Sequence, residues 1–348
     1  MRAMLLSAGL GTRLRPLTYK VAKPMISVVN RPSISYSLNL LKKTGVRKVV
    51  INLYHQAWQV KEYLGKGEKF NIVELLYSEE KHLLGTAGGL KKVEAYFKDT
   101  FLVLSADGIT SFDLSKAVQF HRQKKALATV ILKGVGERFK YGVVQRDEEN
   151  QITQFIEKPD WGDAFSNEVN AGIYIFEPEI FSYIPSRQPY DFGHQVLPFL
   201  ARERKKVYGY LMDDYWADIG NLQDYRRVQK DILKGETGTQ ISGKQRRKGV
   251  WIGEDSEVSE SAILEPPVVI GNNCRIEAKV KIGKYTTLGH RVTVKKEACL
   301  KSCILWNDVL VGEKVHLDDC ILGHFACIPS GFSMSKGVVV EKAVSYKL

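Results

Sequence analysis

A glycine-rich loop near the amino terminus carries concentrated positive charge. Residues 6–18 read LSAGLGTRLRPLT, and AKPM follows at residues 22–25. Glycine has no Cβ, so Gly9 and Gly11 let backbone N–H groups approach an anion closely. Leu14 replaces the third glycine of the dinucleotide fingerprint and no Gly-Lys-Ser/Thr follows, so neither common phosphate-loop motif fits. Two loop glycines alone could form a simple tight turn, but the neighbouring cations favour an anion site; they are Arg13, Arg15 and Lys23.

Two aspartates could supply metal ligands. Asp107 follows a predicted strand in SADG, and Asp218 precedes a predicted helix in YWADIGN. A carboxylate at the carboxyl end of a sheet strand faces the ligand crevice of an α/β fold. Each aspartate alone could equally be a turn residue or a helix cap. If the two converge, they could share a Mg²⁺ ion that bridges phosphate oxygens.

The elements that must position these residues alternate between strand and helix over the first 235 residues. Short apolar runs predict strands at residues 2–6, 48–52, 72–77 and 101–105. Helical patterns cover residues 32–44, 56–64, 114–124 and 221–233. This alternation predicts a Rossmann-like, mostly parallel, doubly wound α/β sheet with ligands beyond the carboxyl ends of its strands.

The pattern changes near Gly235. Ile252-Gly253, Ile270-Gly271 and Ile282-Gly283 begin 18 and then 12 residues apart, both multiples of six, and the spacing degrades after Val294. Hexapeptide periodicity indicates a β-helix, here of about five coils. We therefore expect a first domain at residues 1–235, a linker at 236–249 and a β-helix domain at 250–348.

Composition limits the possible partners and the compartment. Lysine and arginine number 51 against 39 aspartate and glutamate, a net charge of +12 that suits anionic ligands. No basic segment is interleaved with aromatic residues, so we expect no nucleic-acid partner. No apolar run is long enough for a membrane span and no secretory signal is visible, so we expect a cytoplasmic protein without membrane contact. The five cysteines are expected to be buried thiols in a reducing compartment.

The ordered motifs resemble the sugar-phosphate nucleotidylyltransferase family. The resemblance rests on residues 6–18 and 22–25 together with GTAGG (85–89), SADG (105–108), EKP (157–159), NAGIY (170–174) and YWADIGN (215–221). It is strongest to mannose-1-phosphate guanylyltransferases, through WGDAFSNEVNAGIYIFEPEIFSYIP (161–185) and DYWADIGNLQDY (214–225). The C-terminal repeat resembles the left-handed β-helix of some members. Residues 1–235 would then be the catalytic domain, and the β-helix would support a homo-oligomer.

The resemblance implies Mg²⁺-dependent transfer of a nucleotide from GTP to mannose 1-phosphate, with release of pyrophosphate. Arg13 and Lys23 would bind the triphosphate, Asp107 and Asp218 would hold the metal, and Lys158 would neutralise the sugar phosphate. The nucleotide would be bordered by Ala8, Gly9, Gly11, Thr12, Gly85 and Thr86. The sugar would be bordered by Gly142, Glu157 and Asn170.

Three positions depart from the family pattern. Ala106 replaces a common glycine, Gln195 replaces a common acidic residue, and His82 stands where guanylyltransferases tend to carry the glutamate of Glu-Pro-Leu. A carboxylate could accept from guanine N1–H and N2–H₂, so the loss of that glutamate leaves guanine preference open, with Glu79 or Glu80 as substitutes. The alternative donors are dTTP, UTP or ATP with glucose 1-phosphate, or a heptose phosphate as acceptor.

Two alternatives belong to other functional classes. A non-catalytic regulatory paralogue would keep the fold, but such proteins usually lose one of the charged site residues, all of which are present here. An acyltransferase activity of the β-helix would need a catalytic histidine, and none of the available residues lies in a recognisable motif; these are His290, His316 and His324.

Overall fold

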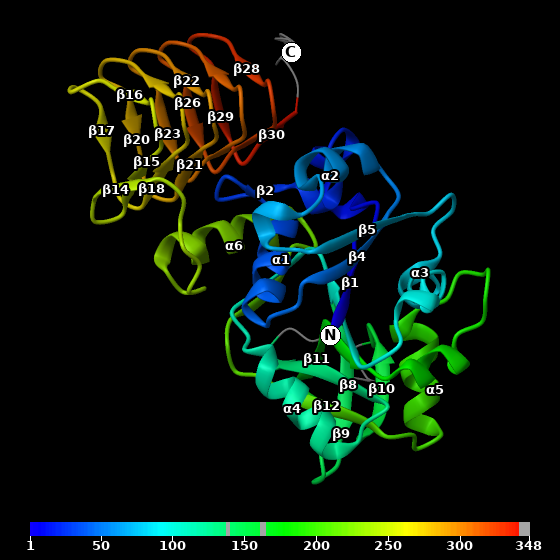
Figure 1. Cartoon of the computed structure of the whole chain (residues 1–348). Helices are drawn as coiled ribbons and strands as arrows, with labels where there is room; N and C mark the ends of the chain where they lie inside the picture. The colour runs from blue at the N-terminus through cyan, green and yellow to red at the C-terminus, as the bar shows by residue number, and fades with distance from the viewer. Residues whose placement is uncertain (137–139, 161–164, 341–348) are drawn as a thin grey trace. The chain divides into compact units, whose positions relative to one another are not determined.

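A nine-stranded mixed β-sheet is the framework of the first part of the chain (Figure 1). The computed structural model describes residues 1–136, 140–160 and 165–340, so residues 161–164 of the family motif and the last eight of the predicted β-helix domain lie outside it. Four neighbouring strands are parallel, in the order β6 (Phe101–Ser105), β1 (Arg2–Leu6), β4 (Lys48–Leu53) and β5 (Glu74–Glu79). These four confirm the predicted strands, although β5 lies two residues later than expected.

The other five strands make the sheet mixed. β11 pairs antiparallel with β6, β8 and β9, and β10 pairs antiparallel with β9, while β12 runs parallel to β8. These strands are β8 (Ala128–Gly134), β9 (Gly142–Arg146), β10 (Ile152–Glu157), β11 (Glu168–Phe176) and β12 (Val207–Leu211). None of these five strands was predicted, so the antiparallel part of the sheet is known from the structure alone.

Helices cover both faces of this sheet. Along β1, Ala3 and Leu5 pack into one core and Met4 into the other, because successive strand residues point to opposite faces. The first core contains side chains of α1 (Ile34–Lys43), α2 (Ala57–Leu64) and α4 (Leu114–Lys124). The second contains side chains of α3 (Gly85–Lys91), the π-helical turn η7 (Phe192–Val196) and α5 (Leu197–Arg202). The predicted α/β architecture is confirmed.

The compact units of the chain do not follow the sequence order. One unit comprises Met1–Leu10, Ala22–Met25 and Ser33–Asp218. The other groups Gly11–Val21 and Ile26–Pro32 with the chain from Ile219 onward, including α6 (Leu222–Lys234). The boundaries expected at residues 235 and 250 stay predictions that rest on the change of sequence pattern.

The C-terminal repeat forms a parallel β-helix of three sheets (Figure 1). The first sheet contains β14 (Lys244–Arg247), β15 (Val250–Ile252), β18 (Val268–Ile270), β21 (Thr286–Leu288), β24 (Ile304–Leu305), β27 (Ile321–Leu322) and β30 (Val338–Val339). The second contains β16 (Glu257–Val258), β19 (Arg275–Ile276), β22 (Thr293–Val294), β25 (Leu310–Val311) and β28 (Cys327–Ile328). The third contains β17 (Ile263–Leu264), β20 (Lys281–Ile282), β23 (Cys299–Lys301), β26 (His316–Asp318) and β29 (Ser333–Ser335).

A shortened corner explains why the hexapeptide spacing degrades. Val250 pairs with Val268, which lies 18 positions later, whereas Ile304 pairs with Ile321, only 17 positions later. The missing residue is at the turn from the third sheet back to the first. The apolar core continues through all coils because the strands stay in register. Part of the expected linker, β14, is itself a strand that pairs antiparallel with β15.

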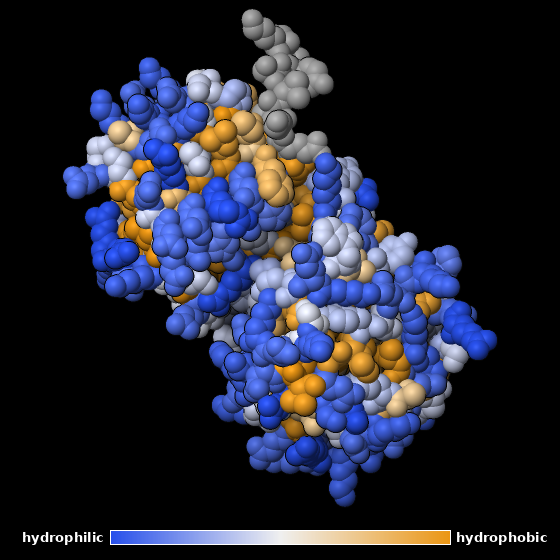
Figure 2. Space-filling model, turned by 45° about the horizontal axis from the view of Figure 1, so that its top comes forward, coloured by the Kyte–Doolittle hydropathy of each residue, from blue (hydrophilic) through white to orange (hydrophobic). Residues whose placement is uncertain are grey.

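Hydrophilic side chains cover most of the face drawn in Figure 2, as expected for a chain with 26% charged residues. Among the described residues, the helices are too short or too polar to cross a membrane.

Candidate active site

A cavity of about 280 Å³ lies at the carboxyl ends of β1, β4 and β6. Parallel strands that end at one edge of a sheet present their following loops to the same crevice. Residues after β1 and β6 therefore meet here, although they are about a hundred positions apart. The predicted site residues that line the cavity are Ala8, Gly9, Lys23, Gly85, Thr86 and Asp107. Four residues that were not predicted as site residues also line it: Ser7, Asn52, Ser105 and Asp191.

Lys23 and Asp107 form the charged centre of the cavity. Lys23 belongs to a short 3₁₀ turn, η3 (Lys23–Met25), and its ammonium donates a hydrogen bond to Asp107 Oδ2. Both side chains are largely shielded from solvent, at 17% and 16% exposure. The turn is held in place because Ala22 N donates to Gln59 Oε1 and Ser33 Oγ donates to the Pro24 carbonyl. The lysine therefore reaches the carboxylate from a fixed backbone.

Asp218 reaches the same place through a two-stranded ladder. β7 (Gly108–Thr110) begins directly after Asp107 and pairs antiparallel with β13 (Trp216–Asp218). In this register Asp218 is opposite Gly108, so the two aspartates become neighbours. Trp216 Nε1 also donates to the Ala171 carbonyl, which ties the ladder to β11. The sequence pattern predicted only that Asp218 precedes a helix, and its position beside Asp107 is known from the structure.

The Asp107 carboxyl group is held in its ionised form, which favours the binding of a cation. Burial raises the pKa of this carboxyl, but the Lys23 ammonium and the hydrogen-bonding contacts with Lys23 and Asp218 outweigh it, so the pKa lies below its usual value. Carboxylate oxygens are the ligands that Mg²⁺ prefers, and the ion commonly binds one or two carboxylates while phosphate and water complete its shell. The described part of the chain offers no cluster of three or more such ligands. The neighbouring carboxylates of Asp107 and Asp218 are therefore a donor pair of the kind that such an ion can share with other ligands.

The loop after β1 leaves open space beside the cavity. A Cβ added at Gly9 would meet no other atom within 4 Å, so the protein itself does not require glycine there. The backbone N–H of Ser7 donates to Asn52 Oδ1 at 2.7 Å, which fixes the start of the loop. The buried Ser7 hydroxyl has no hydrogen-bond partner among the described residues. A buried hydroxyl without a partner in a cavity is suited to a ligand.

The start of α3 needs its glycine for a steric reason. Gly85 has a φ of +72°, and a Cβ there would lie 2.5 Å from the Tyr190 carbonyl oxygen. The same carbonyl accepts from Ala87 N and Gly88 N, each at 3.0 Å. Thr86 Oγ1 donates to Asp191 Oδ2 at 2.8 Å. The GTAGG motif is thus packed tightly against residues 190–191.

Glu80 is buried beside the cavity and is already bonded on both oxygens. Its Oε1 accepts from Asn52 Nδ2 at 2.7 Å, and its Oε2 accepts from Leu84 N at 2.9 Å. A Cβ at Gly89 would lie 2.7 Å from Glu80 Oε1, so this glycine makes room for the carboxylate. Glu79 instead pairs with Lys61, and His82 is exposed. Of the two substitutes considered for guanine recognition, only Glu80 lines the cavity.

The residues that were predicted to border the sugar are not among those that line this cavity. Glu157 ends β10, and Cβ atoms added at Gly142 and Gly193 would lie 2.7 and 2.5 Å from its Oε2. Burial raises the pKa of Glu157 more than neighbouring Lys158 lowers it. Lys158 Nζ is 3.6 Å from Glu157 Oε1 and is half-exposed. Asn170 on β11 donates to the Tyr174 hydroxyl at 2.7 Å.

The remaining predicted residues are in the second compact unit. Gly11 has a left-handed backbone, with a φ of +63°, and precedes the 3₁₀ turn η1 (Thr12–Leu14). Its carbonyl accepts from Thr18 Oγ1 at 2.8 Å and from Leu14 N at 2.9 Å. Thr12 and Arg13 are exposed. These internal hydrogen bonds stabilise the turn, and the Arg13 side chain is exposed to solvent.

An α/β sheet with a charged cavity at its strand ends is typical of enzymes that bind nucleotides. The nucleotidyl transferase family matches residues 2–235, and the GMPPB C-terminal domain matches residues 247–347. The chain belongs to the sugar-1-phosphate nucleotidylyltransferases. This agrees with the family inferred from the sequence motifs.

Individual relatives differ in their substrates. A UTP–glucose-1-phosphate uridylyltransferase of Synechocystis sp. is 37% identical over 348 residues, covering 95% of this chain and 89% of that protein. Mannose-1-phosphate guanylyltransferase 1 of Arabidopsis thaliana is 31% identical, covering 92% and 93% of the two chains. A solved Bacillus anthracis structure, named as a glucose-1-phosphate thymidylyltransferase, superposes with a TM-score of 0.59 at 25% identity, covering 66% of this chain and 93% of that one. The family is thus shown, whereas the base and sugar are not.

Proposed function

We propose that this enzyme transfers GMP from GTP to mannose 1-phosphate, giving GDP-mannose and pyrophosphate. The observation that carries the reaction is the convergence of Lys23, Asp107 and Asp218 at the cavity edge. The guanylyltransferase relatives and the GMPPB C-terminal domain match support the choice of guanine and mannose. Partly buried, hydrogen-bonded charges of this kind are suited to a reaction in which negative charge moves between phosphates.

The reaction needs little covalent chemistry from the protein. A phosphate oxygen of the sugar phosphate attacks the α-phosphorus of the triphosphate, and the bond to the departing pyrophosphate breaks with its electron pair. The attacking phosphate is already ionised near neutral pH, so no general base is required. A magnesium ion held by Asp107 and Asp218 would supply charge neutralisation to the triphosphate. Lys23 and Arg13 would bind the triphosphate oxygens, and Lys158 would orient the sugar phosphate.

A second candidate is UTP with glucose 1-phosphate. It is favoured by the uridylyltransferase relative and by Glu80, whose two oxygens already accept hydrogen bonds from Asn52 and Leu84. Uracil presents one N–H donor where guanine presents an N1–H and an amino group. A carboxylate whose two oxygens already accept hydrogen bonds is better suited to accept the single N–H of uracil than the two donor groups of guanine.

The test is pyrophosphate release with Mg²⁺ across a matrix of nucleoside triphosphates and sugar 1-phosphates. The expected result is a strong preference for GTP with mannose 1-phosphate. Preference for UTP with glucose 1-phosphate would overturn the assignment of the base and sugar while keeping the reaction. An Asp107→Asn variant purified in parallel controls for contaminating activity. No release from any pair by folded protein would point instead to the regulatory paralogue, which nucleotide binding by calorimetry would then detect.

Assembly and location are part of the same proposal. We expect a homo-oligomer through the β-helix, because a coil stack ends in strand edges with unpaired backbone groups. Light scattering coupled to gel filtration would show a single oligomer, and a monomer at micromolar concentration would contradict it. A cytoplasmic location is supported by the five free cysteines, three of which are buried: Cys274, Cys303 and Cys320.

A further inference from the structure

A buried chain of hydrogen bonds joins the β-helix to α6 and to the hairpin of β2 (Ser27–Val28) and β3 (Arg31–Pro32). Trp306 and Tyr225 are among the largest fully buried side chains. Trp306 Nε1 donates to the Tyr225 hydroxyl at 2.9 Å, and that hydroxyl donates to the Ser27 carbonyl. Burial raises the pKa of Tyr225 far above its usual value, so the hydroxyl keeps its proton.

Gln229, one turn further along α6, holds the same hairpin by both ends of its amide. Its Nε2 donates to the Ser27 carbonyl at 3.1 Å, and its Oε1 accepts from Val29 N at 2.8 Å. Gln229 is only 1% exposed. Two further bonds fix the hairpin tip: Asn30 Nδ2 donates to the Leu288 carbonyl at 2.6 Å, and Arg31 Nε donates to Ser242 Oγ at 2.7 Å.

Such a network specifies one position of the backbone. Apolar packing tolerates small shifts because it has no preferred direction, whereas a buried amide that loses a partner is left with an uncompensated polar group. The Ser27 carbonyl accepts from two α6 side chains, so a shift of the hairpin would break both bonds. The network therefore fixes the hairpin against α6.

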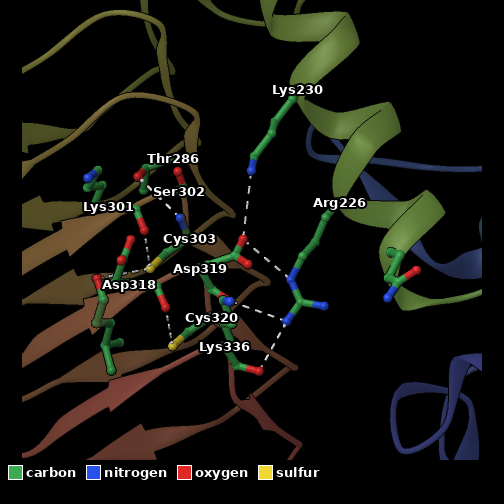
Figure 3. A network of polar contacts seen from close by, with 12 residues as sticks. Arg226, Lys230, Thr286, Lys301, Ser302, Cys303, Asp318, Asp319, Cys320 and Lys336 are labelled. Carbon is green, nitrogen blue, oxygen red and sulfur yellow. Dashed lines mark hydrogen bonds and ion pairs between the residues drawn. The ribbon is translucent and has the colours of Figure 1, made fainter.

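α6 itself is fixed on another side by the β-helix corner (Figure 3). The Arg226 guanidinium donates to the Asp319 carbonyl at 3.2 Å and to the Lys336 carbonyl at 3.5 Å. Its Nε is also 3.5 Å from Asp319 Oδ1, and Lys230 is 3.9 Å from the same oxygen. Asp319 and Lys336 are at the shortened turns that distinguish the 17-residue coils, and both have left-handed backbones, with φ of +52° and +57°. The helix is a rigid support for the hairpin.

Two short chain segments connect this network to Lys23 and to Asp218. Ser27 is four residues after Lys23, and the α6 N-cap Asn221 is three residues after Asp218. Asn221 Oδ1 accepts from Gln223 N at 2.9 Å and from Asp224 N at 3.0 Å, so the helix start is also fixed. Lys23 and Asp218 are therefore each attached by a short peptide to one hydrogen-bonded support.

We propose that Tyr225 and Gln229 are positioning residues for nucleotidyl transfer, through which the β-helix fixes the backbone that carries Lys23. This inference rests on the proposed role of Lys23 in binding the triphosphate. Neither residue would contact substrate; each acts through the hairpin. The β-helix then contributes to the rate of the reaction as well as to assembly.

The test compares Tyr225→Phe and Gln229→Met with Val228→Ala in the full-length protein. Val228 is a buried neighbour on the same helix, so its truncation weakens packing while the hydrogen bonds remain. We expect kcat to fall by about 10- to 100-fold in the first two variants, the range known for small displacements of reacting groups. Val228→Ala should stay within about twofold of the wild-type kcat at a temperature where all three are folded. Amide exchange at residues 26–32 should accelerate in Gln229→Met.

A double-mutant cycle separates positioning from a general structural effect. If Tyr225 acts through Lys23, Tyr225→Phe should cost much less in a Lys23→Arg background than in the wild type. Equal fold losses in the two backgrounds, or the same kcat in Tyr225→Phe and Val228→Ala, would overturn the inference. A Lys23→Arg variant with wild-type kcat would instead count against the proposed role of Lys23, so the two failures are distinguishable.

Discussion

Lys23 and Asp107, 84 positions apart in the chain, form a hydrogen-bonded ion pair at the carboxyl end of β6. The pair keeps a shielded carboxylate charged, since the pKa of Asp107 lies below its usual value although burial raises it. The two charges also compensate each other where both side chains are largely shielded from solvent. An ionised carboxylate beside an ammonium group offers one charged partner each to a cation and to an anion.

Removing the charge of Asp107 should stop catalysis with little change in shape. Asp107→Asn is nearly isosteric but loses the anion that faces Lys23. We expect kcat to fall by about 10²- to 10³-fold, the scale of losing one electrostatic contact in a preorganised site. Pyrophosphate release measured over a range of Mg²⁺ concentrations checks this. Asp99→Asn, at a side chain 86% exposed, is the matched control; a kcat of Asp107→Asn within threefold of that control would contradict the prediction.

Arg13 should matter for turnover and not for stability. Its side chain is exposed on η1, and surface substitutions usually change stability by no more than about 0.5 kcal/mol. Arg13→Gln should therefore unfold at the wild-type temperature while kcat/KM for the triphosphate falls by about 10²-fold. Arg15→Gln, the same substitution in the same loop, serves as the comparison. Equal losses in both variants would assign the effect to the loop's total charge instead of to Arg13.

The space around Glu157 predicts a selective effect on the sugar substrate. A Cβ at Gly193 would lie 2.5 Å from Glu157 Oε2 and 2.9 Å from its Cδ, so Gly193→Ala must displace this carboxylate. We expect KM for the sugar 1-phosphate to rise by about tenfold, equivalent to ~1.4 kcal/mol, with KM for the triphosphate unchanged. Gly134→Ala is the control, because a Cβ there meets no atom within 4 Å. A rise in KM for the triphosphate alone would refute the sugar role of Glu157.

His121 should make stability depend on pH. It is 1% exposed, and its ring nitrogens contact Thr129 Oγ1 at 2.9 Å and Glu177 Oε1 at 3.1 Å. Burial lowers its pKa more than the contact with Glu177 raises it. The unfolded chain then binds the proton more readily, so this contribution to stability is complete above pH 6.5 and is lost as the pH falls toward the lower folded-state pKa.

Thermal unfolding at about pH 7.5 and about pH 5.5 measures this effect. The wild type should lose more stability on acidification than His121→Gln does. His290 and His324, whose pKa values are also lowered by burial, are present in both proteins and cancel in the comparison. Identical pH dependence in the two proteins would show that His121 titrates normally.

Local patterns in the sequence were enough for much of the framework. The run of apolar residues at 101–105 predicted β6, and the amphipathic pattern of residues 114–124 predicted α4 with its exact bounds. The hexapeptide spacing likewise predicted the β-helix. These features depend on residues a few positions apart, because a strand or helix shows its buried face with a period of 2 or 3.6.

The antiparallel strands were not predicted, for a physical reason. β8 to β11 gain their stability by pairing with one another and with β6, so their identity depends on distant partners as much as on their own residues. The one-residue deletion at the β-helix corner is another such case. It appears in the sequence only as lost periodicity, and the strand register shows that the coil continues at 17 residues.

The sequence by itself determined the reaction family, because the charged residues and glycines of the motifs stand in an ordered series that few proteins share. Only the tertiary structure decided which of them meet. Asp218 becomes a neighbour of Asp107 through the β7–β13 ladder. Hydrogen bonds at the ends of β1, β4 and β5 join Ser7, Asn52 and Glu80 beside the cavity. The spacing of residues along the chain does not determine these contacts, because the pairing of distant segments depends on the packing of the whole sheet between them.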